Sequence, residues 1–245
     1  MKILTLLAAP LALLALSALA APTPSGGDGL GSKDYKWARM HGEFAAALAA
    51  DGNAVVGKEG YEACEACHMP NGAGKADGSY PQLAGQHATV LIKQMADIRL
   101  GLRDNPPMLP YARQLKDAQG LADVAAYIET LCIPLDHGRY EGADAAQQIA
   151  TGKALYDKQC TQCHGAQGEG NAAKFYPVTA GQHYKYLLRQ LTTIRDGKRK
   201  NANPEMVKLV KPYTDDQLVA MSAYQASLTM RGAMCQPRGF APTSK

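Results

Sequence analysis

The sequence predicts an all-α protein built from two similar domains in tandem. A chain of 245 residues is long for one small domain and comfortable for two of about 100 residues each. A C-x-x-C-H run at residues 64–68 recurs at residues 160–164. Apolar residues follow helical spacing after each run, and no segment shows the alternation that marks a strand. We therefore expect a duplicated helical unit with a duplicated function.

The first twenty residues have the parts of a secretory signal peptide. Lys2 is followed by an apolar run over residues 3–19, and a small-x-small triplet ends at Ala20, after which we expect cleavage. The alternative is an uncleaved membrane anchor, but the run is short for a spanning helix and Pro10 interrupts it. We expect the mature chain in the periplasm, with no stable membrane insertion after cleavage.

Residues 21–53 form an N-terminal extension that has no counterpart in the second half. Its first part is rich in Pro, Gly and Ser, which predicts a flexible leader. Apolar residues such as Trp37 and Phe44 then predict an amphipathic helix over residues 34–50. We expect this helix to pack on the first domain, and the alternative is that it docks a partner.

Each C-x-x-C-H run predicts covalent attachment of a c-type haem. Two thiols one helical turn apart can form thioethers to the two vinyl groups, and the adjoining imidazole can then bind the iron. A single Cys-x-x-Cys could also be half of a zinc site or a redox dithiol. Two copies in matching surroundings favour two covalently bound haem c groups. The expected attachment residues are Cys64, Cys67, Cys160 and Cys163, and the expected proximal ligands are His68 and His164.

A second repeat supports the duplication. The segment from Tyr80 to His87 is echoed from Tyr176 to His183, at the same offset of 96 residues that separates the two haem runs. The segments that follow, residues 90–103 and 186–199, predict a pair of matching helices.

Several side chains of this repeat are candidates for contacts near the haem. Tyr80-Pro81 and Tyr176-Pro177 could lie on the proximal side, where a carbonyl that accepts the histidine ring N–H would orient the ligand. The alternative for each pair is a simple turn. His87 and His183 could serve as sixth ligands in a bis-histidine site, but we favour hydrogen bonds near the haem or at the domain contact.

Methionine is the expected sixth ligand in both halves. Met108 and Met206 lie 40 and 42 residues after the proximal histidines, each in an Asn-Pro-x-Met context. The alternative is that each fills a gap in the core, as most methionines do. The matched context in both repeats favours the ligand interpretation.

The remaining segments complete the two domains. Final helices are predicted over residues 117–131 and 214–228, the second with an N-cap at Thr214. The predicted division places the first domain at residues 54–134, a linker at 135–142, the second domain at 143–232 and a tail at 233–245.

Cys132 and Cys235 are left after haem attachment. In an oxidising compartment an even remainder favours one disulfide, and two separately buried thiols are the alternative. Each cysteine lies beyond the last helix of its half, so a bond would tie the halves together.

Charge is distributed unevenly. Residues 21–135 hold 10 Lys and Arg against 13 Asp and Glu, whereas residues 136–245 hold 15 against 9. The run Lys198-Arg199-Lys200 is either a solvated face or a surface that steers an acidic redox partner. Nucleic acid is not implied, because no binding motif accompanies the basic residues.

The sequence resembles the dihaem cytochrome c4 family over about Val56 to Leu228. The resemblance rests on the two C-x-x-C-H runs, the doubled Tyr-Pro-x-x-Ala-Gly-Gln-His, the doubled Asn-Pro-x-Met and the closing helices. It implies two class I cytochrome c domains related by a pseudo-twofold axis, with His68/Met108 and His164/Met206 ligation. The N-terminal extension, the tail and the extra cysteines depart from the family pattern.

The resemblance implies an electron carrier without catalytic residues. Expected partners are redox proteins: a terminal oxidase, a membrane cytochrome complex or a dehydrogenase. One alternative is an electron-accepting subunit of a dehydrogenase complex. Another is a dihaem enzyme such as a thiosulfate dehydrogenase or a peroxidase, which would need an open or displaceable axial position at one iron.

Overall fold

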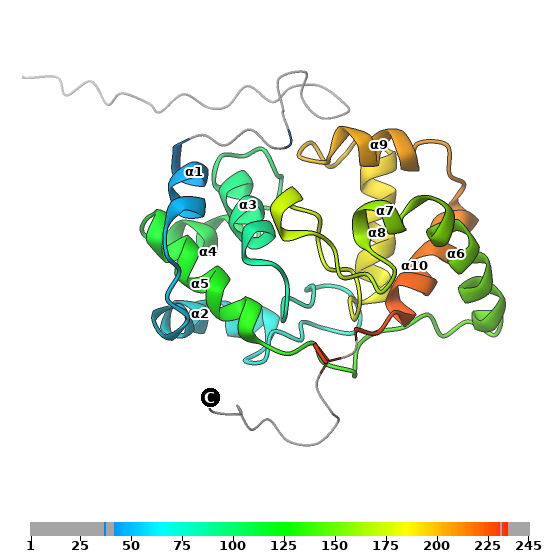
Figure 1. Cartoon of the computed structure of the whole chain (residues 1–245), viewed down its shortest axis with the longest axis horizontal. Helices are drawn as coiled ribbons and strands as arrows, with labels where there is room; N and C mark the ends of the chain where they lie inside the picture. The colour runs from blue at the N-terminus through cyan, green and yellow to red at the C-terminus, as the bar shows by residue number, and fades with distance from the viewer. Residues whose placement is uncertain (1–36, 38–41, 231, 235–245) are drawn as a thin grey trace, which may run out of the picture.

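The computed structural model describes residue 37, residues 42–230 and residues 232–234. Two groups of helices lie side by side, α1 to α5 in one and α6 to α10 in the other, and irregular loops meet between them (Figure 1). The predicted all-α fold of two tandem domains is confirmed. The helices are α1 (Gly42–Ala49), α2 (Ala54–His68), α3 (Ala88–Arg99), α4 (Leu109–Gln114), α5 (Ala118–Thr130), α6 (Ala145–Gln159), α7 (Thr161–His164), α8 (Tyr184–Arg195), α9 (Pro204–Val210) and α10 (Asp215–Ser227), with a 3-10 turn η1 (Ala172–Lys174).

In each domain the first long helix crosses the last one at a glycine. A Cβ atom added at Gly57 of α2 would lie 1.9 Å from the Asp123 carbonyl oxygen of α5. In the second domain a Cβ at Gly152 of α6 would lie 2.0 Å from the Ala220 oxygen of α10. Only glycine lets the two backbones approach this closely. These crossings set the direction in which α2, and α6 with its continuation α7, lead into the C-x-x-C-H runs.

The ends of the principal helices are fixed by side chains. Asn53 accepts backbone N–H groups at the start of α2, and Asp117 accepts one at the start of α5. Thr214 and Gln217 form a capping box on α10, which confirms the predicted N-cap. The helices predicted after each Tyr-Pro loop are α3 and α8, and both end four residues earlier than expected, before Gly101 and Gly197.

The N-terminal extension joins both domains. Within the described residues the predicted helix is seen as α1, and residues 21–36 and 38–41 lie outside the described part of the chain. Phe44 is 3% exposed in the core of the first domain, and its ring lies 5.6 Å from that of Phe175, which follows η1 of the second domain. The Trp37 indole N–H donates to the Lys174 carbonyl at 3.1 Å. The extension thus packs on the first domain, as predicted, and also holds the second.

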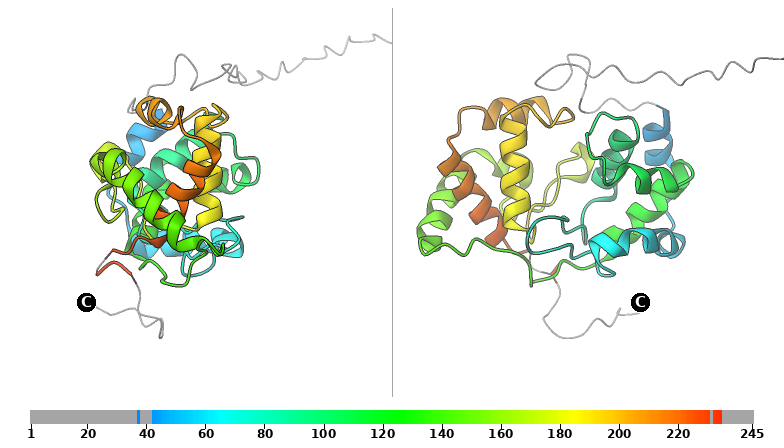
Figure 2. Two further views of the ribbon diagram at one scale, coloured as in Figure 1. Left: turned by 90° about the vertical axis from the view of Figure 1, so that its right-hand side faces the viewer. Right: turned by 180° about the vertical axis from the view of Figure 1, so that it is seen from behind.

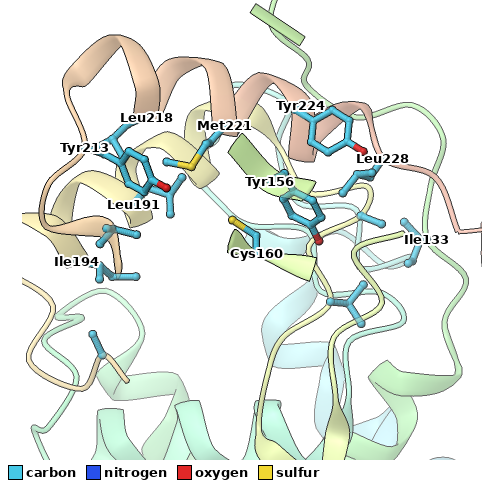
Figure 3. Close-up of a cluster of buried hydrophobic side chains, with 14 residues drawn as sticks. Ile133, Tyr156, Cys160, Leu191, Ile194, Tyr213, Leu218, Met221, Tyr224 and Leu228 are labelled. Atoms are coloured by element: carbon cyan, nitrogen blue, oxygen red, sulfur yellow. The ribbon is translucent and has the colours of Figure 1, made fainter. Parts of the chain in front are cut away.

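The second domain has its own core, formed where α6, α8 and α10 face one another (Figure 3). Tyr156 and Tyr224 meet edge to face with ring centroids 5.2 Å apart, in the same cluster as Leu218 and Met221. Ile133, which was assigned to the first domain, is fully buried in this core. A Cβ at Gly85 or Gly181 would lie 2.8 or 2.3 Å from its side chain, so the two repeats approach each other at Ile133.

The segment between α5 and α6 includes the predicted linker and is closely packed. His137 is 7% exposed and its ring Nε2 lies 2.7 Å from the Ala226 carbonyl. A Cβ at Gly138 would lie 2.0 Å from the Ala76 carbonyl of the first domain. The linker therefore fills space between the domains.

Extended structure within the described residues is limited to two isolated bridges, Ile133 with Met234 and Asn171 with Tyr176. Over the same residues, no helix combines the length and the apolar character needed to cross a bilayer.

Candidate haem sites

The two C-x-x-C-H runs lie at the ends of helices. In the first domain α2 is continuous to His68, whereas in the second the chain breaks at Cys160 between α6 and α7. Cys64, Cys67, Cys160 and Cys163 are not paired in disulfides, so all four sulfur atoms are available for haem attachment. Burial raises the pKa of Cys64 to about 11 and that of Cys160 to about 12.

Both expected proximal histidines are buried with one ring nitrogen occupied. His68 Nδ1 lies 2.9 Å from the Pro81 carbonyl oxygen, and His164 Nδ1 lies 3.2 Å from that of Pro177. A carbonyl can only accept, so Nδ1 carries the proton and Nε2 keeps its lone pair. Burial lowers the pKa of both rings, which favours the neutral form. A neutral imidazole with a free Nε2 is the form that binds a metal.

Two glycines that sequence reasoning missed hold these carbonyls in place. Gly74 has φ +67° and Gly170 has φ +71°. An added Cβ would lie 2.5 Å from the Pro81 oxygen in the first domain and 2.6 Å from the Pro177 oxygen in the second. Their repetition at the offset of 96 was the available signal.

The tyrosines that precede these prolines lie beside the haem runs. The Tyr80 ring meets that of His68 edge to face, with centroids 6.1 Å apart. A hydrogen bond with the Cys67 thiol raises the pKa of Tyr80, and burial together with Cys163 raises that of Tyr176. Both Tyr-Pro pairs therefore lie at the proximal histidines and are more than turns.

The candidate methionines occupy matching places in slightly different structures. Met108 is the residue before α4, and Met206 lies in the first turn of α9, which Asn203 caps. Both side chains are half-buried, and Met206 packs against the second core. The ligand assignment for both remains a prediction.

His87 and His183 lie at the domain contact, where the loops of the two domains meet (Figure 2). His87 Nε2 lies 2.8 Å from the Glu169 carbonyl, and His183 Nε2 lies 2.8 Å from the Ala73 carbonyl. Ala73 and Glu169 are themselves 96 residues apart. The two contacts are related by the pseudo-twofold axis. Each occupies the Nε2 atom that would have to bind iron in a bis-histidine site.

Two glutamines cross the same contact. The Gln182 side chain accepts from the Gln82 N–H at 3.0 Å and donates to the Gln82 carbonyl at 2.8 Å. Gln86 does the same with Val178, at 2.9 and 3.0 Å. Sequence reasoning noted these glutamines only as part of the repeat and gave them no role.

Arg199 belongs to the domain contact. Its guanidinium donates to Gln94 of the first domain at 3.0 Å and to Gln190 of its own domain at 2.8 Å. Asn201, which is fully buried, donates to Asp97 at 2.8 Å. The interpretation of residues 198–200 as one solvated face must be corrected. Arg199, the central residue of the run, hydrogen-bonds to Gln94 and so joins the two domains.

The expected disulfide is described at one end only. Cys132 is disulfide-bonded, and Cys235 lies outside the described residues. The next residue, Ile133, donates its N–H to the Ala233 carbonyl at 2.9 Å, so the segments that carry the two cysteines run together. Pairing of Cys132 with Cys235 remains a prediction.

The donor sets of both domains fit covalently attached haem. Within the described ranges, no group of three or more His, Cys, Asp or Glu side chains is arranged to hold a metal ion. Covalent attachment of haem c needs two thiols, and its iron needs an imidazole with a free Nε2; each domain supplies them.

Comparison with known proteins shows which family the chain resembles in sequence and in fold. The family model described as Cytochrome c matches residues 49–132 and again residues 149–229. Cytochrome c4 of Azotobacter vinelandii is 33% identical over 187 residues, covering 71% of this chain and 89% of that protein. A thiosulfate dehydrogenase electron acceptor of Stutzerimonas stutzeri is 35% identical over 193 residues, covering 74% and 88%. The crystal structure of reduced recombinant cytochrome c4 from Pseudomonas stutzeri superposes with a TM-score of 0.63 at 30% identity, covering 73% of this chain and 100% of that one.

Proposed function

Because the chain belongs to the cytochrome c4 family, we propose that it carries single electrons between redox proteins of the periplasm. It is a dihaem c-type cytochrome of the electron-carrier type, with two covalently bound haem c groups. The location rests on the signal peptide at residues 1–20, which lie outside the described part of the chain.

We assign His68 with Met108 to the first iron and His164 with Met206 to the second. The supporting observation is that each buried imidazole donates Nδ1–H to a proline carbonyl, which leaves Nε2 as the only nitrogen for the metal. Bound haem would supply the one-electron couple, and Met108 and Met206 would hold the irons together with the histidines and keep them closed to other ligands. The protein's own residues orient the imidazoles and hold the two domains in contact.

A redox titration followed by optical and near-infrared spectra tests this assignment. The wild-type protein should show two low-spin haems and a sulfur-to-iron charge-transfer band that accounts for both. Met108→Ala and Met206→Ala should each remove half of that band. Met95→Leu is the control, because Met95 packs against the first core and the second repeat carries leucine at the same place. A high-spin haem in the wild type, or an unchanged band in either alanine variant, would reject the ligand set.

A second candidate function is the electron acceptor of a thiosulfate-oxidising enzyme. It is supported by the relative from Stutzerimonas stutzeri that carries this name. Stopped-flow mixing separates the alternatives. A carrier that serves as acceptor is reduced by thiosulfate only when the enzyme is also present. Reduction by thiosulfate alone would show that the chain is itself an enzyme, and failure with the enzyme present would remove this candidate partner.

A further inference from the structure

One peptide group connects the first proximal histidine to the other domain. The amide between Pro81 and Gln82 offers its carbonyl to His68 Nδ1 at 2.9 Å. The N–H of the same amide donates to Oε1 of Gln182, in the second domain, at 3.0 Å. An imidazole, a peptide and a side-chain amide thus form one continuous chain of hydrogen bonds.

The second domain repeats this chain in the opposite direction. The amide between Pro177 and Val178 accepts from His164 Nδ1 at 3.2 Å and donates to Oε1 of Gln86 at 2.9 Å. Gln86 and Gln182 are 96 residues apart, as are the two prolines. Each glutamine therefore reaches the peptide group that orients the histidine of the opposite domain.

The glutamines are held so that their oxygens face these N–H groups. Gln86 is 8% exposed and Gln182 is 6% exposed, in a contact from which water is largely excluded. In each glutamine Oε1 accepts the N–H of the opposite residue, and Nε2 donates to the carbonyl of that same residue. The Nε2 distances are 2.8 Å from Gln182 to Gln82 and 3.0 Å from Gln86 to Val178. These paired bonds fix the orientation of each amide, since reversing it would set donor against donor.

We propose that Gln86 and Gln182 are positioning residues that set the reduction potential of the haem in the opposite domain. Donation from a peptide N–H polarises the amide and makes its carbonyl a better acceptor, and such chains strengthen each bond by about 10–30%. A better acceptor draws the Nδ1 proton of the histidine and makes Nε2 more basic. A more basic ligand stabilises the oxidised iron, so each glutamine lowers the potential of the opposite haem. This inference rests on the proposed histidine ligation.

The test uses full-length, haem-loaded protein with Gln182→Leu and Gln86→Leu. Spectroelectrochemical titration gives the two potentials, and proton NMR of the haem methyl groups, assigned to each domain, shows which haem moves. Gln182→Leu should raise the potential of the haem attached at Cys64 and Cys67 and leave the other in place. Gln86→Leu should raise only the haem attached at Cys160 and Cys163.

Gln94→Leu is the matched control, because Gln94 accepts hydrogen bonds from Arg199 and Asn201 across the same contact but does not touch either peptide. If it reproduces either shift, the effect comes from a loosened contact and the proposal is wrong. A shift of the haem in the variant's own domain, or no shift, also overturns it.

Gln182→Glu keeps an acceptor at Oε1 and serves if the leucine variant does not fold. It should lower the potential of the first haem more than that of the second, and an equal change in both would count against the proposal. Failure of the proposed function is seen separately, because the wild-type spectrum would then lack two low-spin haems.

Discussion

At the residue scale, Gly74 and Gly170 leave room for the Pro81 and Pro177 carbonyls, which orient the proximal histidines. Gly74→Ala should lower the free energy of unfolding by about 1–2 kcal/mol through its positive φ alone, and by more because the new Cβ would displace Pro81. Haem spectra should change as well, since the imidazole of His68 would lose its fixed acceptor. Thermal melts and optical spectra measure both effects.

Gly42→Ala separates these causes. Gly42 also has a positive φ, +48°, but no atom of the described residues lies within 4 Å of the position of its Cβ. This variant should show the backbone cost and keep the wild-type spectrum. If both substitutions change the free energy of unfolding and the haem spectrum equally, the close contact between Gly74 and Pro81 is not the cause.

His183 makes stability depend on pH. Its Nδ1 accepts the Gly138 N–H at 3.0 Å while Nε2 donates to Ala73, so the folded state needs the neutral ring, and burial lowers the pKa of His183. His137 opposes protonation and the Asp77 carboxylate favours it. The stabilisation is complete above the ordinary histidine pKa of about 6.5. It falls below that pH, because the unfolded chain then binds a proton that the folded chain does not, with a slope of at most about 1.4 kcal/mol per pH unit.

Denaturant unfolding of the haem-loaded protein at pH 7 and pH 5 measures this dependence. His183→Gln should show a smaller difference between the two pH values than the wild type. His87→Gln is the matched substitution at the counterpart position of the repeat. If His183→Gln keeps the wild-type difference, another group is responsible.

At the scale of elements, α1 acts as a brace between the domains. Phe44→Ala should lower the free energy of unfolding by about 3–5 kcal/mol, as for other buried aromatic residues. Because Phe44 contacts Phe175, hydrogen exchange at residues 172–175 should also become faster. Val55→Ala is the control, since Val55 is 77% exposed and its loss should change stability by less than about 0.5 kcal/mol. Unchanged exchange in Phe44→Ala would confine α1 to the first domain.

The helices were predictable where the local pattern decides them. Apolar residues at helical spacing predict α3, α5, α8 and α10, and Thr214 predicts where α10 begins. The break between α6 and α7 was missed, although its cause is in the sequence. Tyr61 precedes Cys64 by three residues and Tyr156 precedes Cys160 by four, so the second haem run cannot continue the same helix in register.

At the scale of the whole molecule, the charge difference between the domains predicts a preferred docking end. Lys198→Glu with Lys200→Glu should slow electron exchange with an acidic redox protein by about tenfold at low salt, and less at high salt. Arg199 is left intact because it holds the domain contact. Stopped-flow rates against ionic strength measure the effect.

Lys58→Glu with Lys116→Glu provides the matched change on the first domain, where both side chains are exposed. It alters the net charge by the same amount and should have a smaller effect on the rate. Equal slowing by both pairs would show that only the total charge matters.

The contact between the domains is the part that sequence could not supply. Gln86 and Gln182 are repeated, but so are Gln94 and Gln190, and no local pattern tells which pair reaches the proline peptides. Arg199 lies in a run of three basic residues and is nevertheless engaged with Gln94. These roles depend on how two finished domains face each other.

The glutamine exchange has a consequence for how such a chain could arise. In an isologous interface the surface that one copy presents is the surface that it binds. Each half here carries both the glutamine that reaches out and the peptide that receives it. A single-domain ancestor could therefore have paired with a copy of itself through these bonds, and fusion of the two genes would have made an existing homodimer permanent.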